Sequence, residues 1–394
     1  MFYLAGIVIT IFLAVLLTGK KNKTPADGLL IVWLIVIAFH LFLFYLFITG
    51  KIYDYPFFMG IHPPYPLLHG PFLFLYTAAL TGQHPRFKLT WLIHFIPVLI
   101  LYLFLIPFFR LSAAEKMNVY RNYGAGYENL MAISLICIIL SGIGYVLASL
   151  ILQRRYRKAI ENEFSDIEKI KLAWLQYLIY GVAIIWIAVI FGNDSMVFGI
   201  SVLFVFFLGF FGIRQAGIFT TVDPPIVPKQ PIGTGEKAIG SPSTIQPETS
   251  LSEKLPTESI DNSTTKVKYE KSGLAEDQAG RIYERLVQVM TEQKLFRESE
   301  LTLAGLAKTL EVHPNHLSQV INSYEGKNFY DYINFHRVEE FRKLAPRPDN
   351  KNYTLLSMAY ECGFNSKTSF NRNFRKVTGI SPSEYLVQQH ISLK

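Results

Sequence analysis

A short stretch near the end of the chain places cationic and hydrogen-bonding side chains on one face of a predicted helix, residues 366–376. Ser366 can cap its N-terminus, and Phe370, Phe374 and Val377 recur at i, i+4 and i+7, so the inner face is apolar. Such a helix can offer hydrogen bonds to phosphate oxygens and to the edges of bases. The outer face has no acidic residue and consists of Lys367, Thr368, Asn371, Arg372, Arg375 and Lys376.

A second short helix is predicted directly before this one. Its apolar stripe, spaced i, i+3, i+4 and i+7, consists of Leu355, Met358, Ala359 and Cys362. Gly363 then supplies a helix stop. Two short helices joined by a glycine-containing turn are typical of a helix-turn-helix, here residues 355–376, whose second helix enters a DNA major groove. The alternative interpretation is an ordinary basic surface helix.

A longer pattern with fixed spacing surrounds this motif. After the apolar stripe come Gly363-Phe364, Ser366, Phe370, Phe374, Thr378-Gly379, Ser381-Pro382 and Tyr385. This order resembles the second helix-turn-helix of AraC-type bacterial transcription regulators, and the resemblance covers roughly residues 278–389. Met358 stands where that family usually has isoleucine, which conserves volume. The resemblance implies two helix-turn-helix units on one connecting helix, entering neighbouring major grooves on one face of the DNA.

An earlier stretch predicts the other unit, residues 303–322. An amphipathic helix over residues 281–293 precedes it, and Pro314 stands at the first position of its second helix, where a missing N–H costs little. A long helix from about Phe329 to Leu344 joins the two units. The first apolar stripe consists of Leu303, Leu306, Ala307 and Leu310.

Carried onto this chain, the resemblance makes residues 314–322 and 366–376 the two helices that read DNA. The first carries no fixed charge on its outer side chains, so we expect modest base discrimination there. We expect base contacts from Asn315, Ser318 and Gln319 in the first and from Lys367, Thr368 and Arg372 in the second. We expect phosphate contacts from Lys327, Arg375 and Lys376.

The composition divides the chain into unlike parts. Hydrophobic residues make up 51% of the 394 residues, and they crowd into residues 1–220. The net charge of +8 suits either nucleic acid or anionic lipid. The two cysteines, Cys137 and Cys362, allow no disulfide framework, and Cys362 fits a packed hydrophobe better than a redox sensor. We expect neither a metal nor a cofactor.

Long apolar runs predict about seven transmembrane helices in residues 1–220. Each run approaches the roughly 20 residues that cross a bilayer. We expect the first to be a retained span and not a signal peptide, because its lysines follow the apolar stretch and no small-residue cleavage site is evident. The runs are residues 2–17, 29–48, 91–109, 130–152, 172–191 and 196–219, with one more near 64–80, where prolines dilute the signal.

The connections between these runs predict an orientation. With the N-terminus outside, the inner loops hold eleven Lys and Arg residues and the outer loops four. This places residues 274–394 in the cytoplasm of a bacterium, at its inner membrane, where DNA is accessible. Residues 221–273 are rich in Pro, Gly, Ser and Thr and predict a disordered linker with a reach of roughly 40 Å.

The loop between the fifth and sixth runs carries its own signals. Ser165 and Glu168 fit an S-x-x-E capping box, which predicts a helix start that feeds into the sixth run. Four basic residues just before it, within residues 154–158, fit anionic headgroups.

Histidines in or beside the spans are the remaining candidates for chemistry. His40, His62, His69 and His94 are polar groups at membrane depth, where functional residues are common. The simpler interpretation is that interfacial His and Tyr anchor helices. No HExxH or other paired-ligand spacing occurs.

Three classes of function are compatible with these features. The first, and the one we expect, is a membrane-tethered regulator, not an enzyme, that couples a membrane or extracytoplasmic signal of unknown identity to transcription. Its partners would be double-stranded DNA, the lipid bilayer and, as further candidates, a second copy of the chain and RNA polymerase. The alternatives are a transporter or intramembrane enzyme with a regulatory tail, and an interaction scaffold that no longer binds DNA.

Overall fold

The computed structural model describes residues 2–82, 89–168, 170–214 and 274–391. Within these ranges every regular element is helical, apart from one antiparallel bridge between Phe164 and Thr302. The described residues up to Lys158, with 170–214, form a first unit, and Ala159–Glu168 belongs with 274–391 to a second unit. The all-α prediction is confirmed for these residues, whereas the predicted linker, 221–273, lies outside them.

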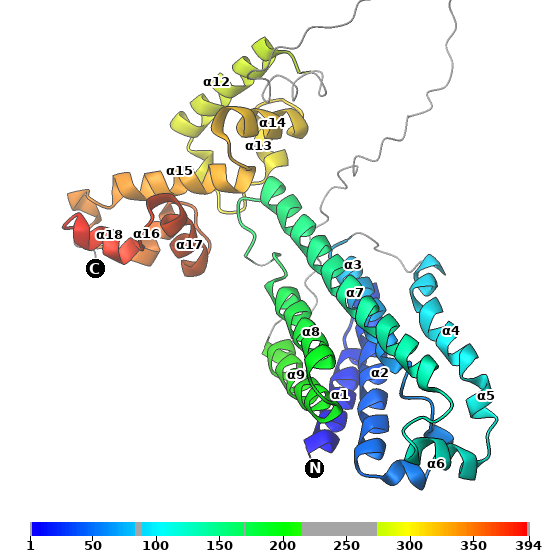
Figure 1. Cartoon of the computed structure of the whole chain (residues 1–394). Helices are drawn as coiled ribbons and strands as arrows, with labels where there is room; N and C mark the ends of the chain where they lie inside the picture. The colour runs from blue at the N-terminus through cyan, green and yellow to red at the C-terminus, as the bar shows by residue number, and fades with distance from the viewer. Residues whose placement is uncertain (1, 83–88, 169, 215–273, 392–394) are drawn as a thin grey trace, which may run out of the picture. The chain divides into compact units, whose positions relative to one another are not determined.

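The first unit is a set of mainly apolar helices (Figure 1). Thr24 starts the second of them with a capping box, in which its hydroxyl accepts from the Asp27 N–H. Lys20 forms an ion pair of 2.9 Å with Asp27, so this buried carboxylate is matched by a cation. The helices are α1 (Phe2–Thr18), α2 (Pro25–Ile48), α3 (His69–Leu80), α4 (Ile96–Phe104), α5 (Ile106–Phe109), α6 (Ala113–Arg121), α7 (Glu128–Glu163), α8 (Ala173–Phe191) and α9 (Asp194–Arg214).

Three of these helices, α2, α7 and α8, have the length and composition to cross a membrane within the described chain. The run 91–109 is broken into shorter helices because Pro97 and Pro107 each stand in a first turn, where a helix begins. The run near 64–80 gives only the 12-residue α3. Shorter apolar helices cover Phe2–Thr18, Leu89–Phe104 and Asp194–Phe210. The number of seven spans therefore stays a prediction.

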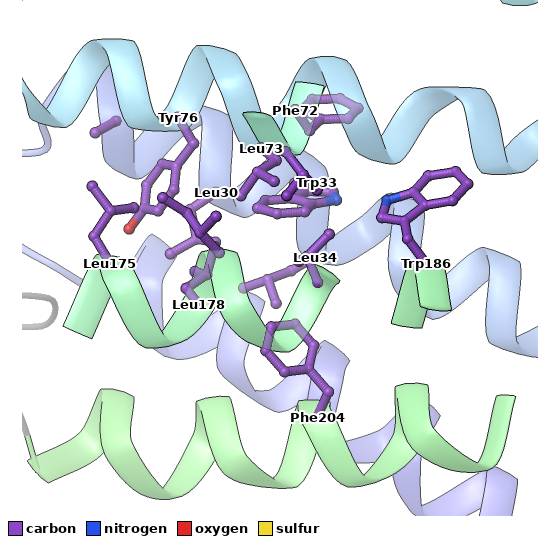
Figure 2. Packing of buried hydrophobic residues seen from close by; sticks show 14 of the residues in the cluster. Leu30, Trp33, Leu34, Phe72, Leu73, Tyr76, Leu175, Leu178, Trp186 and Phe204 are labelled. Atoms are coloured by element: carbon purple, nitrogen blue, oxygen red, sulfur yellow. The ribbon is translucent and has the colours of Figure 1, made fainter. Parts of the chain in front are cut away.

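The interior of the first unit is built from apolar side chains of several helices, and Figure 2 shows large ones that come from α2, α3, α8 and α9. Trp33 stacks on Phe72 with ring centroids 6.4 Å apart and an interplanar angle of 8°. Leu175 and Phe204 bring α8 and α9 to the same cluster. Many other large apolar side chains are exposed, among them Val8, Leu103, Leu140 and Phe191. An exterior of this kind is typical of surfaces that contact a membrane or another protein.

The predicted capping box at Ser165 and Glu168 is wrong. Helix α8 begins only at Ala173, after Leu172 in a left-handed conformation (φ 47°). The N–H of Glu168 donates to the side chain of Asp166, and the hydroxyl of Ser165 accepts from Arg337. A capping box would join Ser165 and Glu168 to each other, whereas here Ser165 bonds to Arg337 and Glu168 to Asp166.

The second unit contains two small helical lobes joined by one long helix, α15 (Figure 1). The N-terminal half of α15 contributes Phe329, Tyr332 and Ile333 to one core, and its C-terminal half contributes Val338 and Phe341 to the other. The helices are α12 (Glu276–Glu292), α13 (Leu303–Thr309), α14 (Pro314–Glu325), α15 (Phe329–Leu344), α16 (Leu355–Glu361), α17 (Lys367–Thr378) and α18 (Pro382–Gln388).

Cys362 lies in the second of these cores and is fully buried. Burial raises the pKa of its thiol to about 12, so the thiol stays protonated at neutral pH. This environment agrees with the prediction of a packed side chain.

Candidate nucleic-acid interface

The first helix-turn-helix consists of α13 and α14, as the sequence predicts. The Thr302 hydroxyl caps α13 by accepting from the Gly305 N–H at 3.0 Å. Pro314 occupies the first turn of α14, and His313 caps it by accepting from the Asn315 N–H at 3.2 Å. Because Leu317, Val320 and Ile321 are buried, the opposite side of α14 faces solvent in this unit.

The three predicted base contacts of α14 lie on its accessible side. Asn315 is exposed, and Ser318 and Gln319 are half-buried. The backbone carbonyl of Ser318 accepts from the Asn322 side chain at 2.8 Å. These three side chains are polar and uncharged, and the modest base discrimination expected of them stays a prediction.

The second helix-turn-helix consists of α16 and α17, and its turn requires glycine. Gly363 has φ +95°, and a Cβ there would lie 2.6 Å from the carbonyl oxygen of Phe296. Ser366 caps α17 by accepting from the Ser369 N–H at 3.1 Å. Both the predicted stop and the predicted cap are confirmed.

The outer face of α17 holds the predicted basic surface. Lys367, Thr368 and Arg375 are exposed. Lys376 is also exposed, but its ammonium group forms an ion pair of 2.6 Å with Asp331 on α15. Lys327, from the turn before α15, pairs with Glu325 at 3.0 Å and lies 4.6 Å from the centroid of the Phe335 ring. Two of the three predicted phosphate contacts are thus partly neutralised by carboxylates.

Arg372 differs most from the sequence prediction, because its guanidinium group already has protein partners. Its Nη1 lies 2.7 Å from Oε1 of Glu168, and its Nη2 donates to the hydroxyl of Tyr330. The Tyr330 hydroxyl also accepts from Asn373, a buried residue on α17. The sequence predicts a base contact for Arg372, which stays a prediction; in this structure its guanidinium group pairs with an acidic residue instead.

Glu168 belongs to Ala159–Glu168, the docking segment, which is part of the second unit. The backbone of Ser165 donates to Leu301 O at 3.2 Å and accepts from the Asn334 side chain at 2.9 Å. Asn365, in the turn before α17, donates to Asp166 at 2.8 Å. The docking segment therefore contacts the loop before α13, the helix α15 and the turn of the second helix-turn-helix.

Arg337 on α15 is the buried centre of these contacts, with 1% of its surface exposed. Its guanidinium donates to Ser165 Oγ at 3.1 Å and to the carbonyls of Phe296 and Glu298 at 2.7 Å each. Burial lowers its pKa to about 10, so it remains charged at neutral pH. Sequence reasoning missed Arg337, and the only available signal was a charged residue between the apolar positions of the connecting helix.

No group of three or more His, Cys, Asp or Glu side chains that could hold a metal ion occurs in the described part of the chain. The polar surfaces of α14 and α17 offer hydrogen bonds and positive charge, which is the chemistry of nucleic-acid recognition.

Comparisons with known proteins bear on the same region. The Helix-turn-helix domain family matches residues 306–388. The uncharacterized HTH-type transcriptional regulator YijO of Escherichia coli (strain K12) is 36% identical over 95 residues, which are 24% of this chain and 32% of that protein. The uncharacterized HTH-type transcriptional regulator YtdP of Bacillus subtilis (strain 168) is 27% identical over 135 residues, 34% of this chain and 16% of that protein.

A third relative is the transcriptional regulatory protein HptR of Staphylococcus aureus (strain NCTC 8325 / PS 47), 24% identical over 101 residues, 26% of this chain and 38% of that protein. The chain spans well under half the length of these curated relatives. No solved structure matches the chain. The C-terminal part of the chain is therefore a helix-turn-helix domain of the kind found in bacterial transcriptional regulators.

Proposed function

We propose that this protein is a membrane-tethered, sequence-specific DNA-binding transcription regulator that couples a membrane or extracytoplasmic signal to gene expression. The observation that carries the proposal is the pair of helix-turn-helix units on α15, each with a polar outer surface. The match of residues 306–388 to the Helix-turn-helix domain family supports the DNA-binding part.

In this proposal the two exposed helices divide the work of recognition. Direct base contacts come from Asn315, Ser318 and Gln319 on α14 and from Lys367, Thr368 and Arg372 on α17. Lys327, Arg375 and Lys376 bind phosphates. Because Asp331 and Glu325 already pair with Lys376 and Lys327, phosphates have to replace these carboxylates, and salt will weaken binding further.

Tethering to a bacterial inner membrane is supported by the apolar helices of the first unit. Helices α2, α7 and α8 are long enough to span a bilayer, and large apolar side chains such as Leu103 and Leu140 are exposed. The excess of Lys and Arg in alternate connections favours an external N-terminus and a cytoplasmic C-terminal domain. A second copy of the chain and RNA polymerase are the further partners we expect.

The docking segment supports the proposed coupling. Its first residues, Ala159–Glu163, are the last residues of α7, and α8 begins at Ala173, a few residues after its end. Its Glu168 pairs with Arg372. A signal that displaces the ends of these helices would form or break the ion pair between Glu168 and Arg372. While this ion pair is formed, Arg372 does not contact DNA.

The test is selection of bound duplexes from a random pool by the full chain in lipid nanodiscs. We expect a defined sequence and salt-dependent affinity. Arg372→Ala should relax the choice of one base pair at a cost of about 1–3 kcal/mol. Equal binding to all sequences by the wild-type protein would refute sequence-specific regulation, and a reporter fused after Lys394 that is active only outside the cytoplasm would refute the topology.

A further inference from the structure

The first unit contains a cavity of about 710 Å³, lined by residues from α2, α3, α6, α7, α8 and α9. This volume lies within the range of about 300–1,000 Å³ that small-molecule sites occupy. Most of the lining is apolar or aromatic, including Trp33 and Trp186, whose positions Figure 2 shows. Polar side chains also reach the lining, and among them are three histidines, His40, His62 and His69.

A chain of hydrogen bonds fixes the tautomers of two of these histidines. The indole Nε1–H of Trp33 donates to Nδ1 of His69 at 3.2 Å, and because an indole can only donate, that Nδ1 carries no proton. The proton of neutral His69 is therefore on Nε2, which lies 2.8 Å from Nδ1 of His40. Nδ1 of His40 has to accept this bond, so the proton of His40 is on Nε2.

The Nε2–H of His40 ends this chain as a buried donor without a partner among the described residues. His40 is only 9% exposed. Nε2 of His62 is likewise buried without a partner in the described chain, and the two imidazole centroids are 5.1 Å apart. Buried donors in native proteins nearly always have an acceptor, since an unsatisfied one costs about 1–3 kcal/mol.

The charges around the cavity restrict what can supply the acceptor. None of the described lining residues is Lys, Arg or Glu, and Asp194 alone carries a carboxylate. An anionic ligand would meet no cation there and would be repelled by Asp194. A neutral ligand with an oxygen acceptor avoids both costs.

We propose that this cavity binds a neutral, largely apolar small molecule whose carbonyl oxygen accepts a hydrogen bond from Nε2 of His40. The aromatic walls bury the apolar body, and the Trp33–His69–His40 chain holds the donor in one tautomer. The identification of this ligand with the signal rests on the proposed function, whereas the binding of the ligand in the cavity does not depend on that function.

The test uses benzophenone, a neutral aromatic ketone that also forms photo-crosslinks, with the full chain in lipid nanodiscs. We expect saturable labelling that mass spectrometry maps to cavity-lining peptides of α2, α7 or α9. Diphenylmethane has the same two rings and no carbonyl, so it should compete at least about fivefold more weakly, the equivalent of one hydrogen bond. This comparison needs no variant of the protein.

His40→Phe keeps an aromatic ring and removes the donor, and should weaken benzophenone labelling by at least about fivefold. The matched control is His94→Phe, because His94 contacts Tyr145 at 2.9 Å and does not line the cavity. Labelling that does not saturate, equal competition by the hydrocarbon, or equal loss in both variants would overturn the proposal. Labelling is measured without DNA, so this failure is distinct from a failure of DNA recognition.

Discussion

Replacing Glu168 by Gln should increase the affinity of the full chain for its DNA site. Glu168→Gln keeps the shape of the side chain and removes the charge that faces Arg372 at 2.7 Å. The two side chains are 15% and 33% exposed, respectively, so the ion pair is partly screened by solvent and contributes about 1 kcal/mol. If DNA binding has to break this pair, the variant should bind about fivefold more tightly.

The assay is fluorescence anisotropy of a labelled duplex from the selected sequence, titrated with the protein in nanodiscs. Glu339→Gln is the matched control, because it removes the same charge from a carboxylate that pairs with Arg342. In the Arg372→Ala background, Glu168→Gln should give no gain in DNA affinity, because the guanidinium group that pairs with Glu168 is already absent. An unchanged or lower affinity in Glu168→Gln, or an equal gain in Glu339→Gln, would refute the inference that Glu168 competes with DNA.

Two further predictions concern the second helix-turn-helix. Gly363→Ala should lower the free energy of unfolding of the full chain in chemical denaturation by about 2 kcal/mol or more, because φ is +95° and the new Cβ would meet the Phe296 carbonyl at 2.6 Å. Gly326→Ala, also at positive φ but with no atom within 4 Å, is the control and should cost less. Arg375→Ala should weaken binding to every sequence alike and reduce the slope of log affinity against log salt by about 1, which anisotropy at several salt concentrations measures. A change in sequence preference would instead make Arg375 a base contact.

Both helix-turn-helix units could be predicted because their signals are local. Ser366, Gly363 and Pro314 act on the first or last turn of their own helix, and the structure uses each of them in that way. The apolar periodicity of α17 likewise identifies Phe370 and Phe374 as core residues. Short-range capping and periodicity thus determine the accessible face of α17.

The sequence predicts which stretches of the first unit are apolar, but not whether each stretch forms one continuous helix. Hydropathy sums over a window and does not register where a helix ends. Pro97 and Pro107 divide one predicted span into shorter helices, and α3 is short because Tyr65–Leu68 forms a separate 3-10 turn. A local turn or a new helix start changes the summed hydropathy of a run very little, but it divides the run into shorter helices.

The docking segment could not be predicted because its partners are far away in the sequence. The motif formed by Ser165 and Glu168 satisfies the local rule for a helix start, yet Arg337 and Arg372 bind these residues instead. A capping hydrogen bond is worth about 1 kcal/mol, and a buried guanidinium that needs acceptors outweighs it. Local sequence patterns carry no information on contacts between residues that lie so far apart in the sequence.

The two contacts of the docking segment differ in strength, which indicates how it could act. Arg337 is almost fully buried, and losing Ser165 would remove two of its hydrogen bonds, at a cost of about 1.5–3 kcal/mol for each. The pair between Glu168 and Arg372 is partly exposed and worth about 1 kcal/mol. A modest displacement would therefore break the contact at Arg372 first while Ser165 stays bound. The free energy needed to release Arg372 is then below that of removing the whole segment, and it is the smaller amount that the proposed signal has to provide.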